Sequence, residues 1–201
     1  MSLKRILALA SGGAGDPSAL AFAAWLAGHH DKADEVWIKI HKVRSGLPSI
    51  TPKEAIDVAL CWGWIDAVRK SFDANSYLQR YTRRRAKSIW SKINVANVER
   101  LISEGRMTEH GLREVEAAKK DGRWYRAYAG SAEMEIPSDL AAAIDADPAA
   151  KAMYARLTAQ NRYALAFRLH NLKTAAARER KIGEFVEMLR EGRTIYPQRD
   201  K

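Results

Sequence analysis

Residues 60–94 read LCWGWIDAVRKSFDANSYLQRYTRRRAKSIWSKIN, and they predict the central sheet of the protein. The stretch holds three of the six tryptophans, the only cysteine and the densest run of basic residues. Residues 64–72 and 77–82 are rich in apolar and aromatic side chains, and Asp73-Ala74-Asn75-Ser76 between them favours a turn. The pattern predicts a hairpin with a four-residue loop.

A third strand is predicted at residues 35–41, where the side chains alternate in character. Val36, Ile38 and Ile40 form one face, and Trp37, Lys39 and His41 form the other. Strict alternation is typical of a half-buried strand. Together with the hairpin, this strand predicts a small three-stranded antiparallel sheet (about 35–41, 64–72 and 77–82).

Helices are predicted for most of the remaining chain. Thr51-Pro52-Lys53-Glu54 is a capping box with proline in the first turn, and Gly63 ends the helix that follows. Other helices are predicted from Asp16-Pro17 to His29, over 94–104, from Thr108 to 121, near Ser138, at Asp147-Pro148, from Thr158 to His170, and from Thr174 to Gly192. The sequence therefore predicts a predominantly helical α+β fold, with the sheet packed against helices and a C-terminal half that is all helical.

Three parts of the chain follow from this reading. Residues 1–130 form an α+β core, residues 131–193 a helical region packed on it, and residues 194–201 a polar, mobile tail. Ile6–Ala10 is shorter than the roughly seven apolar residues of a signal peptide, so it predicts a short strand or extended arm.

Composition points to a globular protein with anionic partners. The 201 residues are 47% hydrophobic and carry a formal net charge of +10. A charge of this sign favours nucleic acid, phosphorylated small molecules, acidic protein surfaces or anionic membranes, although basic helix faces can also be merely solvated. A single cysteine fits a reducing compartment. With no apolar run long enough to span a membrane, we expect a cytoplasmic protein.

Asp66 is the most informative single residue of the predicted hairpin. It shares a strand face with Trp64, Val68 and Phe72. On a buried face, a carboxylate is costly unless a cation and hydrogen-bond donors meet it. Late in the chain, Arg178 stands in an apolar stripe, so we expect Arg178 or one of Arg83–Arg85 to approach Asp66. The pair either fixes the last helix to the sheet or lines a polar pocket.

The basic run supplies the candidate ligand-binding residues. Arginines beside an aromatic ring can hold phosphates or carboxylates while the ring stacks on a ligand. The predicted binding residues are Arg84, Arg85, Ser88, Trp90 and Asn94, supported by Trp64, Asp66 and Arg178. The alternatives are a solvated strand edge, which prevents sheets from pairing, and a capping role for Ser88 and Ser91.

No motif for catalysis, metal or cofactor is present in the sequence. Cys61 is expected to be a core residue, because His41, His110 and His170 are scattered without catalytic spacing. No ligand spacing resembles a zinc or calcium signature, and no glycine-rich phosphate loop follows a strand. We expect neither metal nor cofactor, and Asp66 is the one acid–base candidate.

Several strings of the sequence occur together in one known family. They are ALCWGWID (59–66), Arg84-Arg85 with Ser88, WSKIN (90–94), GRMT (105–108) with Gly111, and DGRW (121–124). Through these strings the chain resembles the YdeI/OmpD-associated family, also labelled bacteriocin-protection or OmdA-like. The resemblance extends from Trp25 to the Arg178–Ile182 region. The family usually has prolines beside the arginine pair and threonine before the late arginine, where this chain has Arg83, Ala86 and Ala177. Its names imply envelope stress, porin association or bacteriocin protection.

Three functions remain open from the sequence. The first is a non-catalytic protein of stress or bacteriocin protection, which binds an anionic small molecule or an acidic protein surface through a basic and aromatic surface. The second is an enzyme that uses Asp66 as acid or base in a polar pocket. The third is nucleic-acid binding. The sequence does not identify the ligand, the partner or the oligomeric state.

Overall fold

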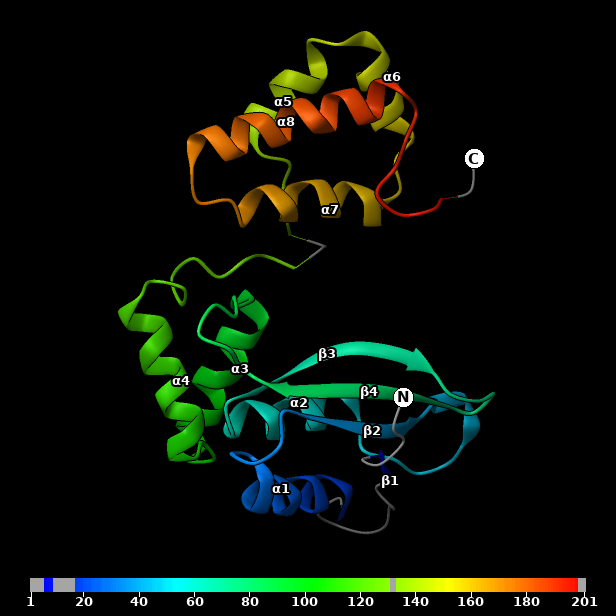
Figure 1. The fold of residues 1–201 in the computed structure, drawn as a ribbon. Helices are drawn as coiled ribbons and strands as arrows, with labels where there is room; N and C mark the ends of the chain where they lie inside the picture. Colours follow the sequence, from blue (N-terminus) through cyan, green and yellow to red (C-terminus); the bar gives the residue numbers. More distant parts are fainter. Residues whose placement is uncertain (1–5, 9–16, 131–132, 199–201) are drawn as a thin grey trace. The chain divides into compact units, whose positions relative to one another are not determined.

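The computed structural model describes residues 6–8, 17–130 and 133–198 (Figure 1). The chain divides into two compact units, Met1–Ala127 and Tyr128–Lys201, and each is considered by itself. The predicted boundary, after residue 130, lies close to this division. The predicted packing of residues 131–193 on the first part of the chain stays a prediction.

The first unit is built on a four-stranded sheet. Its strands are β1 (Ile6–Ala8), β2 (Glu35–His41), β3 (Trp64–Ser71) and β4 (Ser76–Arg83), in the order β1-β2-β4-β3. The three predicted strands are confirmed, and both of their pairings are antiparallel. The additional edge strand β1 pairs with β2 in parallel, so a helix crosses between the two.

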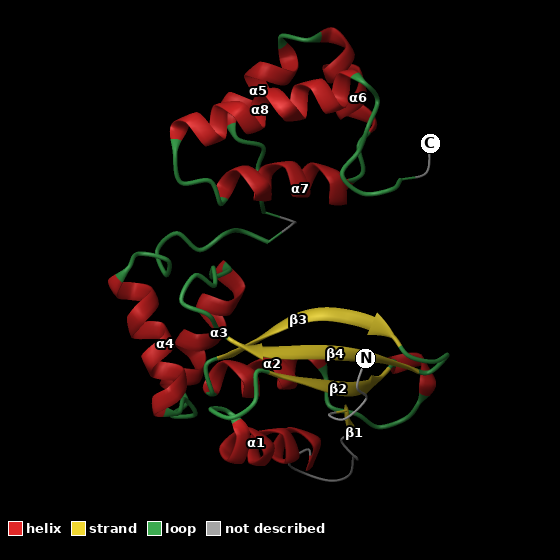
Figure 2. Cartoon of the chain, in the orientation of Figure 1, coloured by secondary structure: helices red, strands yellow, loops and turns green. Residues whose placement is uncertain are grey.

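Helices α1 (Pro17–His29) and α2 (Pro52–Cys61) pack on one face of the sheet (Figure 2). α2 begins with the predicted capping box. The Thr51 hydroxyl accepts a hydrogen bond from the Glu54 backbone N–H, and the Glu54 carboxylate accepts one from the Thr51 backbone N–H. The buried core joins these helices to the alternating face of β2 and to two large aromatic side chains. Its members include Phe22, Leu26, Val36, Ile38, Ile40, Val58, Trp64 and Tyr81.

A second core lies at the end of the sheet, under α3 (Lys92–Ser103) and α4 (Glu109–Lys120). Ser91 caps α3 and Thr108 caps α4, each by accepting a backbone N–H three residues later. The packing between α2 and α4 is close at Gly111. A Cβ atom at this residue would lie 2.4 Å from the Cys61 carbonyl oxygen, so only glycine fits there. The core also contains Cys61, Trp90, Val98, Leu101 and Trp124.

Among its described residues, 128–130 and 133–198, the second unit contains four helices. They are α5 (Ser138–Asp145), α6 (Pro148–Arg156), α7 (Ala159–His170) and α8 (Ala175–Arg190). The predicted all-helical C-terminal half is therefore confirmed. A core of leucine, isoleucine and phenylalanine side chains holds the helices together, with Leu165 and Leu189 almost completely buried. No helix among the described residues is long and apolar enough to cross a membrane.

Residues 194–198, part of the tail that is predicted to be mobile, form hydrogen bonds with α7, and their mobility stays a prediction. The Tyr196 amide donates to Asn161 Oδ1 at 2.9 Å, and Asn161 Nδ2 donates to Gln198 Oε1 at 2.9 Å. Asn161 is buried in α7, with 1% of its surface exposed. A buried amide must find partners for its polar atoms, and this segment supplies them. Residues 199–201 lie outside the described part of the chain.

Candidate functional site: the basic face of the N-terminal sheet

The loop between β4 and α3 contains most of the residues predicted to bind a ligand. In the structure Arg84 and Trp90 are 6% and 2% exposed. The Arg84 guanidinium carbon lies 3.5 Å from the centre of the Trp90 ring, and Arg84 Nη1 donates to the Ile89 carbonyl. These two side chains therefore lie in the interior of the loop, and their contact with a ligand stays a prediction.

The other predicted binding residues lie nearer to solvent. Arg85 is exposed, while Ser88 and Asn94 are half-buried. Ser88 Oγ accepts from the Arg85 amide at 2.9 Å, and the Ser88 carbonyl accepts from Arg123 Nη1 at 2.8 Å. The backbone N–H of Asn94 donates to Ser91 Oγ at the start of α3. Ser91 thus has the expected capping role, and a contact of Arg85, Ser88 or Asn94 with a ligand stays a prediction.

Asp66 is opposite Tyr81, so it shares the side of the sheet that buries Trp64 and Tyr81, but its own side chain is exposed. β3 is an edge strand, and only Trp64 at its start is fully buried. Val68 and Phe72 are 46% and 48% exposed. β3 has a bulge between Asp66 and Arg69, so the residues after the bulge no longer alternate in step with Trp64 and Asp66. Partial desolvation raises the pKa of Asp66, while the charges of Arg84 and Arg69 act in the opposite direction.

We expected Arg178 or one of Arg83–Arg85 to approach Asp66. The charge of Arg84 acts on Asp66, whereas Arg178 pairs with another carboxylate. The Arg178 guanidinium forms two hydrogen bonds with Asp139 of α5, at 2.5 and 2.8 Å. A third hydrogen bond, at 3.1 Å, goes to the Leu169 carbonyl near the end of α7. Arg178 therefore joins α8 to α5 and α7 within the second unit. It forms a structural ion pair, as one alternative proposed, but with Asp139.

Three aromatic side chains of the sheet region have cations over their rings. Lys70 Nζ and Arg80 Cζ lie 5.3 and 5.8 Å from the centre of the Trp37 ring, and Lys39 Nζ lies 5.0 Å from that of Phe72. A cation within about 6 Å of a ring centre is attracted by its π electrons. We call Trp37, Lys39, Lys70, Phe72 and Arg80 the basic sheet face. The third ring, Tyr77, has Arg69 at 4.3 Å and lies on the core side of the sheet.

The strand register explains why these residues meet. Trp37 of β2 is opposite Arg80 of β4, and Leu78 is opposite both Lys39 and Lys70. Directly opposed residues point to the same side of a sheet, and this side is opposite to the one that α1 and α2 cover. Trp37, Lys39 and Arg80 are half-buried, and Lys70 is exposed.

Two carboxylates border the basic sheet face and orient its groups. Glu35 accepts from the Trp37 indole N–H at 3.2 Å and from Arg80 at 3.2 Å. Asp73 lies 3.6 Å from Lys39 Nζ. These pairs are partly exposed, so water and salt screen them strongly. The arrangement presents oriented cations beside aromatic carbon, and an incoming anion can compete for them.

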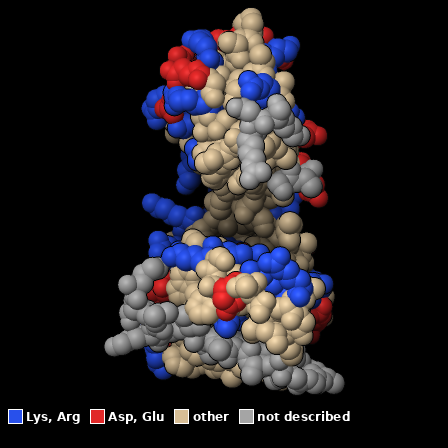
Figure 3. All heavy atoms as spheres, turned by 90° about the vertical axis from the view of Figure 1, so that its right-hand side faces the viewer, with Lys and Arg blue, Asp and Glu red and all other residues tan. Residues whose placement is uncertain are grey.

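The positive charge of the protein is concentrated in the first unit. Residues 1–127 contain 22 of the 34 Lys and Arg and 14 of the 24 Asp and Glu, so they carry +8 of the net +10. Figure 3 shows lysine and arginine side chains gathered in a band over this unit. A field of this sign attracts anionic partners over distances of about 10 Å.

The alternation of residues 35–41 identified Trp37 and Lys39 as neighbours on one strand face. Lys70 could not be added from the sequence, because the bulge in β3 changes which residues of that strand share a face. Arg80 lies in β4, and only strand pairing places it opposite Trp37. Both basic residues also lie within strands whose register is set only by pairing. The sequence therefore shows that these positions are basic, but not that they share a sheet face with Trp37.

The structure offers little support for thiol or metal chemistry. Burial raises the pKa of the Cys61 thiol to about 11, so the reactive thiolate is scarce at neutral pH. Within the described ranges, no group of three or more histidine, cysteine or acidic residues is placed to hold a metal ion.

Two family models match the chain. Residues 17–114 match a model described as a domain of unknown function (DUF8412), and residues 133–192 match the model described as Bacteriocin-protection, YdeI or OmpD-Associated. Most strings that carried the sequence resemblance lie within residues 17–114, so the second match covers less of the chain than we expected. No curated protein and no solved structure is significantly similar to the chain. The resemblance to the YdeI/OmpD-associated family is confirmed for residues 133–192.

Proposed function

We propose that this protein is a non-catalytic, cytoplasmic protein of the bacteriocin- or stress-protection kind, and that it binds an anionic partner through the basic sheet face. The match of residues 133–192 to a model with that description supports the protective role. The cations held over Trp37 and Phe72 are the observation that carries the binding role. An acidic protein surface or an anionic small molecule provides the complementary charge.

Aromatic and basic groups favour an extended acidic partner over a free inorganic ion. Trp37 and Phe72 offer apolar area, and Lys39, Lys70 and Arg80 offer charge beside it. Interfaces commonly combine aromatic and arginine anchors with charges that guide association. Since the cations are already positioned by neighbouring rings, little side-chain entropy is lost when an acidic segment binds.

The binding proposal can be tested with a fluorescently labelled poly-glutamate peptide. We expect the double variant Lys39→Gln/Lys70→Gln to bind it about fivefold or more weakly than the parent, from two lost charge contacts of up to about 1 kcal/mol each. The matched control is Lys53→Gln/Lys120→Gln, which removes the same charge from two exposed helix positions. Equal affinities for the two double variants would contradict a specific role of the sheet face.

Two further measurements separate the alternatives. A single-stranded oligonucleotide of similar length and charge tests the nucleic-acid hypothesis, and its tighter binding would replace the acidic protein as the proposed partner. For the protective role, cells that produce the protein are challenged with a bacteriocin. We expect better survival with the parent and the Lys53→Gln/Lys120→Gln control than with Lys39→Gln/Lys70→Gln. Unchanged survival with all forms, compared with cells lacking the protein, would refute protection.

A further inference from the structure

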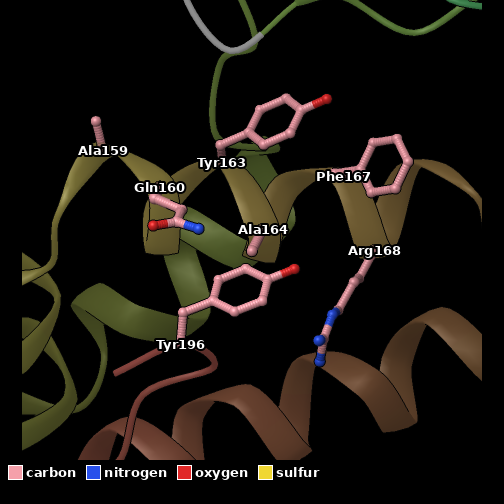
Figure 4. A pocket seen from close by; sticks show the side chains of 7 residues that line it. All are labelled: Ala159, Gln160, Tyr163, Ala164, Phe167, Arg168 and Tyr196. Atoms are coloured by element: carbon pink, nitrogen blue, oxygen red, sulfur yellow. The ribbon is translucent and has the colours of Figure 1, made fainter. Parts of the chain in front are cut away.

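A groove of about 730 Å³ runs along α7 in the second unit (Figure 4). Its lining residues on α7 are spaced by three or four along the helix, so they share one face. The lining consists of Ala159, Gln160, Tyr163, Ala164, Phe167, Arg168 and Tyr196. Ligand pockets of this size are usually apolar and aromatic, with a few polar groups that orient the ligand.

The aromatic walls of the groove are held in place without a ligand. The Tyr163 and Phe167 rings stack with their centres 5.6 Å apart, and Tyr128 packs edge-on against Phe167 at 4.9 Å. In Figure 4, Tyr196 lies across α7 from these rings, with Ala164 between them. The backbone of Tyr196 is fixed by both side-chain atoms of Asn161, at 2.9 and 3.1 Å. The groove is therefore preformed, which lowers the entropy cost of binding.

Arg168 lies at one end of the groove and differs in its contacts from the other described arginines of this unit. It forms no ion pair or hydrogen bond with any residue that the structure describes. The other described arginines of the unit all have partners, for example Arg178 with Asp139, Arg190 with Asp147 and Arg162 with the Ala155 carbonyl. A guanidinium beside apolar rings matches a carboxylate, which it can bind through two parallel hydrogen bonds.

We propose that the α7 groove binds a small aromatic carboxylate. The planar body of the ligand lies against Tyr163, Phe167 and Tyr196 over the small side chain of Ala164, and its carboxylate reaches Arg168. Aromatic rings favour a planar partner through offset or edge-on contacts. The Gln160 amide and the tyrosine hydroxyls offer further hydrogen bonds. This site is separate from the basic sheet face, because its residues all lie in the second unit.

The test uses calorimetric titration of the full chain with indole-3-propionate and with its neutral amide, indole-3-propionamide. We expect the carboxylate to bind about tenfold or more tightly than the amide, as for a charge-assisted hydrogen bond. Arg168→Gln removes this preference by weakening only the carboxylate, and Arg168→Lys restores part of it. The matched control Arg162→Gln changes an arginine of the same helix outside the groove and leaves both affinities unchanged.

Several results would overturn the proposal. Absence of heat at millimolar carboxylate would show that the groove takes no such ligand, and equal affinities for acid and amide would exclude a role of Arg168. A loss of binding in Arg162→Gln as large as in Arg168→Gln would indicate non-specific attraction. The Lys39→Gln/Lys70→Gln variant is expected to bind indole-3-propionate normally, which distinguishes this site from the sheet face.

Discussion

The Arg84 guanidinium stacks on the Trp90 indole at 3.5 Å, and both side chains are buried. Trp90 also packs edge-on against Trp124, with the ring centres 4.9 Å apart. Two sequence features that suggested a binding surface thus form the interior of a loop. The loop carries Arg85 outward, while Arg84 is held against Trp90, which in turn packs on Trp124.

Replacement of Trp90 should therefore destabilise the first unit. We expect Trp90→Ala to lower the free energy of unfolding by about 3–5 kcal/mol, as large aromatic deletions in cores do. Trp90→Phe keeps a ring for Arg84 and should cost less. All six tryptophans lie in the first unit, so urea titration followed by tryptophan fluorescence reports on it. A cost below about 1 kcal/mol for Trp90→Ala would contradict the buried stack.

Two helical glycines predict opposite responses to alanine. At Gly111 a Cβ would meet the Cys61 carbonyl oxygen at 2.4 Å, whereas at Gly183 in α8 it would meet nothing within 4 Å. We expect Gly111→Ala to cost about 2 kcal/mol or more by overpacking. Gly183→Ala should stabilise the second unit by about 0.5–1 kcal/mol through helix propensity. Thermal melts followed by circular dichroism test both, and a shift of the same sign would refute the packing argument.

The Asp57–Arg100 ion pair should respond asymmetrically to mutation. Asp57 is buried in α2 with its side chain 7% exposed, and Arg100 Nη2 donates to it at 2.6 Å from a side chain that is 35% exposed. Arg100→Ala leaves a carboxylate without its cation in a dry site, and we expect a cost of about 2–4 kcal/mol. Asp57→Asn leaves a cation that can reach water, so it should cost about 1 kcal/mol. Urea titration would contradict this order if the asparagine variant were the less stable of the two.

Arg178 and Asp139 should be coupled energetically in the second unit. Their side chains are 31% and 44% exposed, so solvent screening limits the coupling to about 0.5–1.5 kcal/mol despite the bidentate geometry. The measurement is a double-mutant cycle with Arg178→Gln and Asp139→Asn, followed by circular dichroism. Additive effects of the two changes would show that the pair contributes nothing to stability.

The Arg178–Asp139 pair also predicts that the free energy of unfolding depends on pH. Hydrogen bonds from Arg178 lower the pKa of Asp139 in the folded protein. A folded-state pKa below the unfolded one, about 3.9, stabilises the protein above that pH, and the stabilisation is lost as pH falls through the folded pKa. The difference in unfolding free energy between the parent and Asp139→Asn should be constant at neutral pH and shrink below about pH 4. A difference that grows on acidification would refute the assignment.

Local patterns were sufficient to predict the elements of this protein. The alternation of Val36, Ile38 and Ile40, the turn at Asp73 and the capping box at Thr51 act over a few residues, so each can be recognised in the sequence. For the edge strand β1 the sequence predicts a short strand or an extended arm, because three residues carry no periodicity.

The partners of charged side chains could not be predicted in the same way. Arg178 stands in an apolar stripe whether its partner is Asp139 or Asp66, because the stripe shows only that the side chain points inward. In the same way, the sequence of the arginine-rich run beside Trp90 does not show whether the indole ring faces water or the core. Residue types and spacing therefore determined the α+β class, the helix starts and the excess of positive charge, since these depend on neighbours in the chain. Only the tertiary structure decided that Arg84 lies inside and that Trp37, Lys70 and Arg80 meet outside, because strand register and a bulge set those distances.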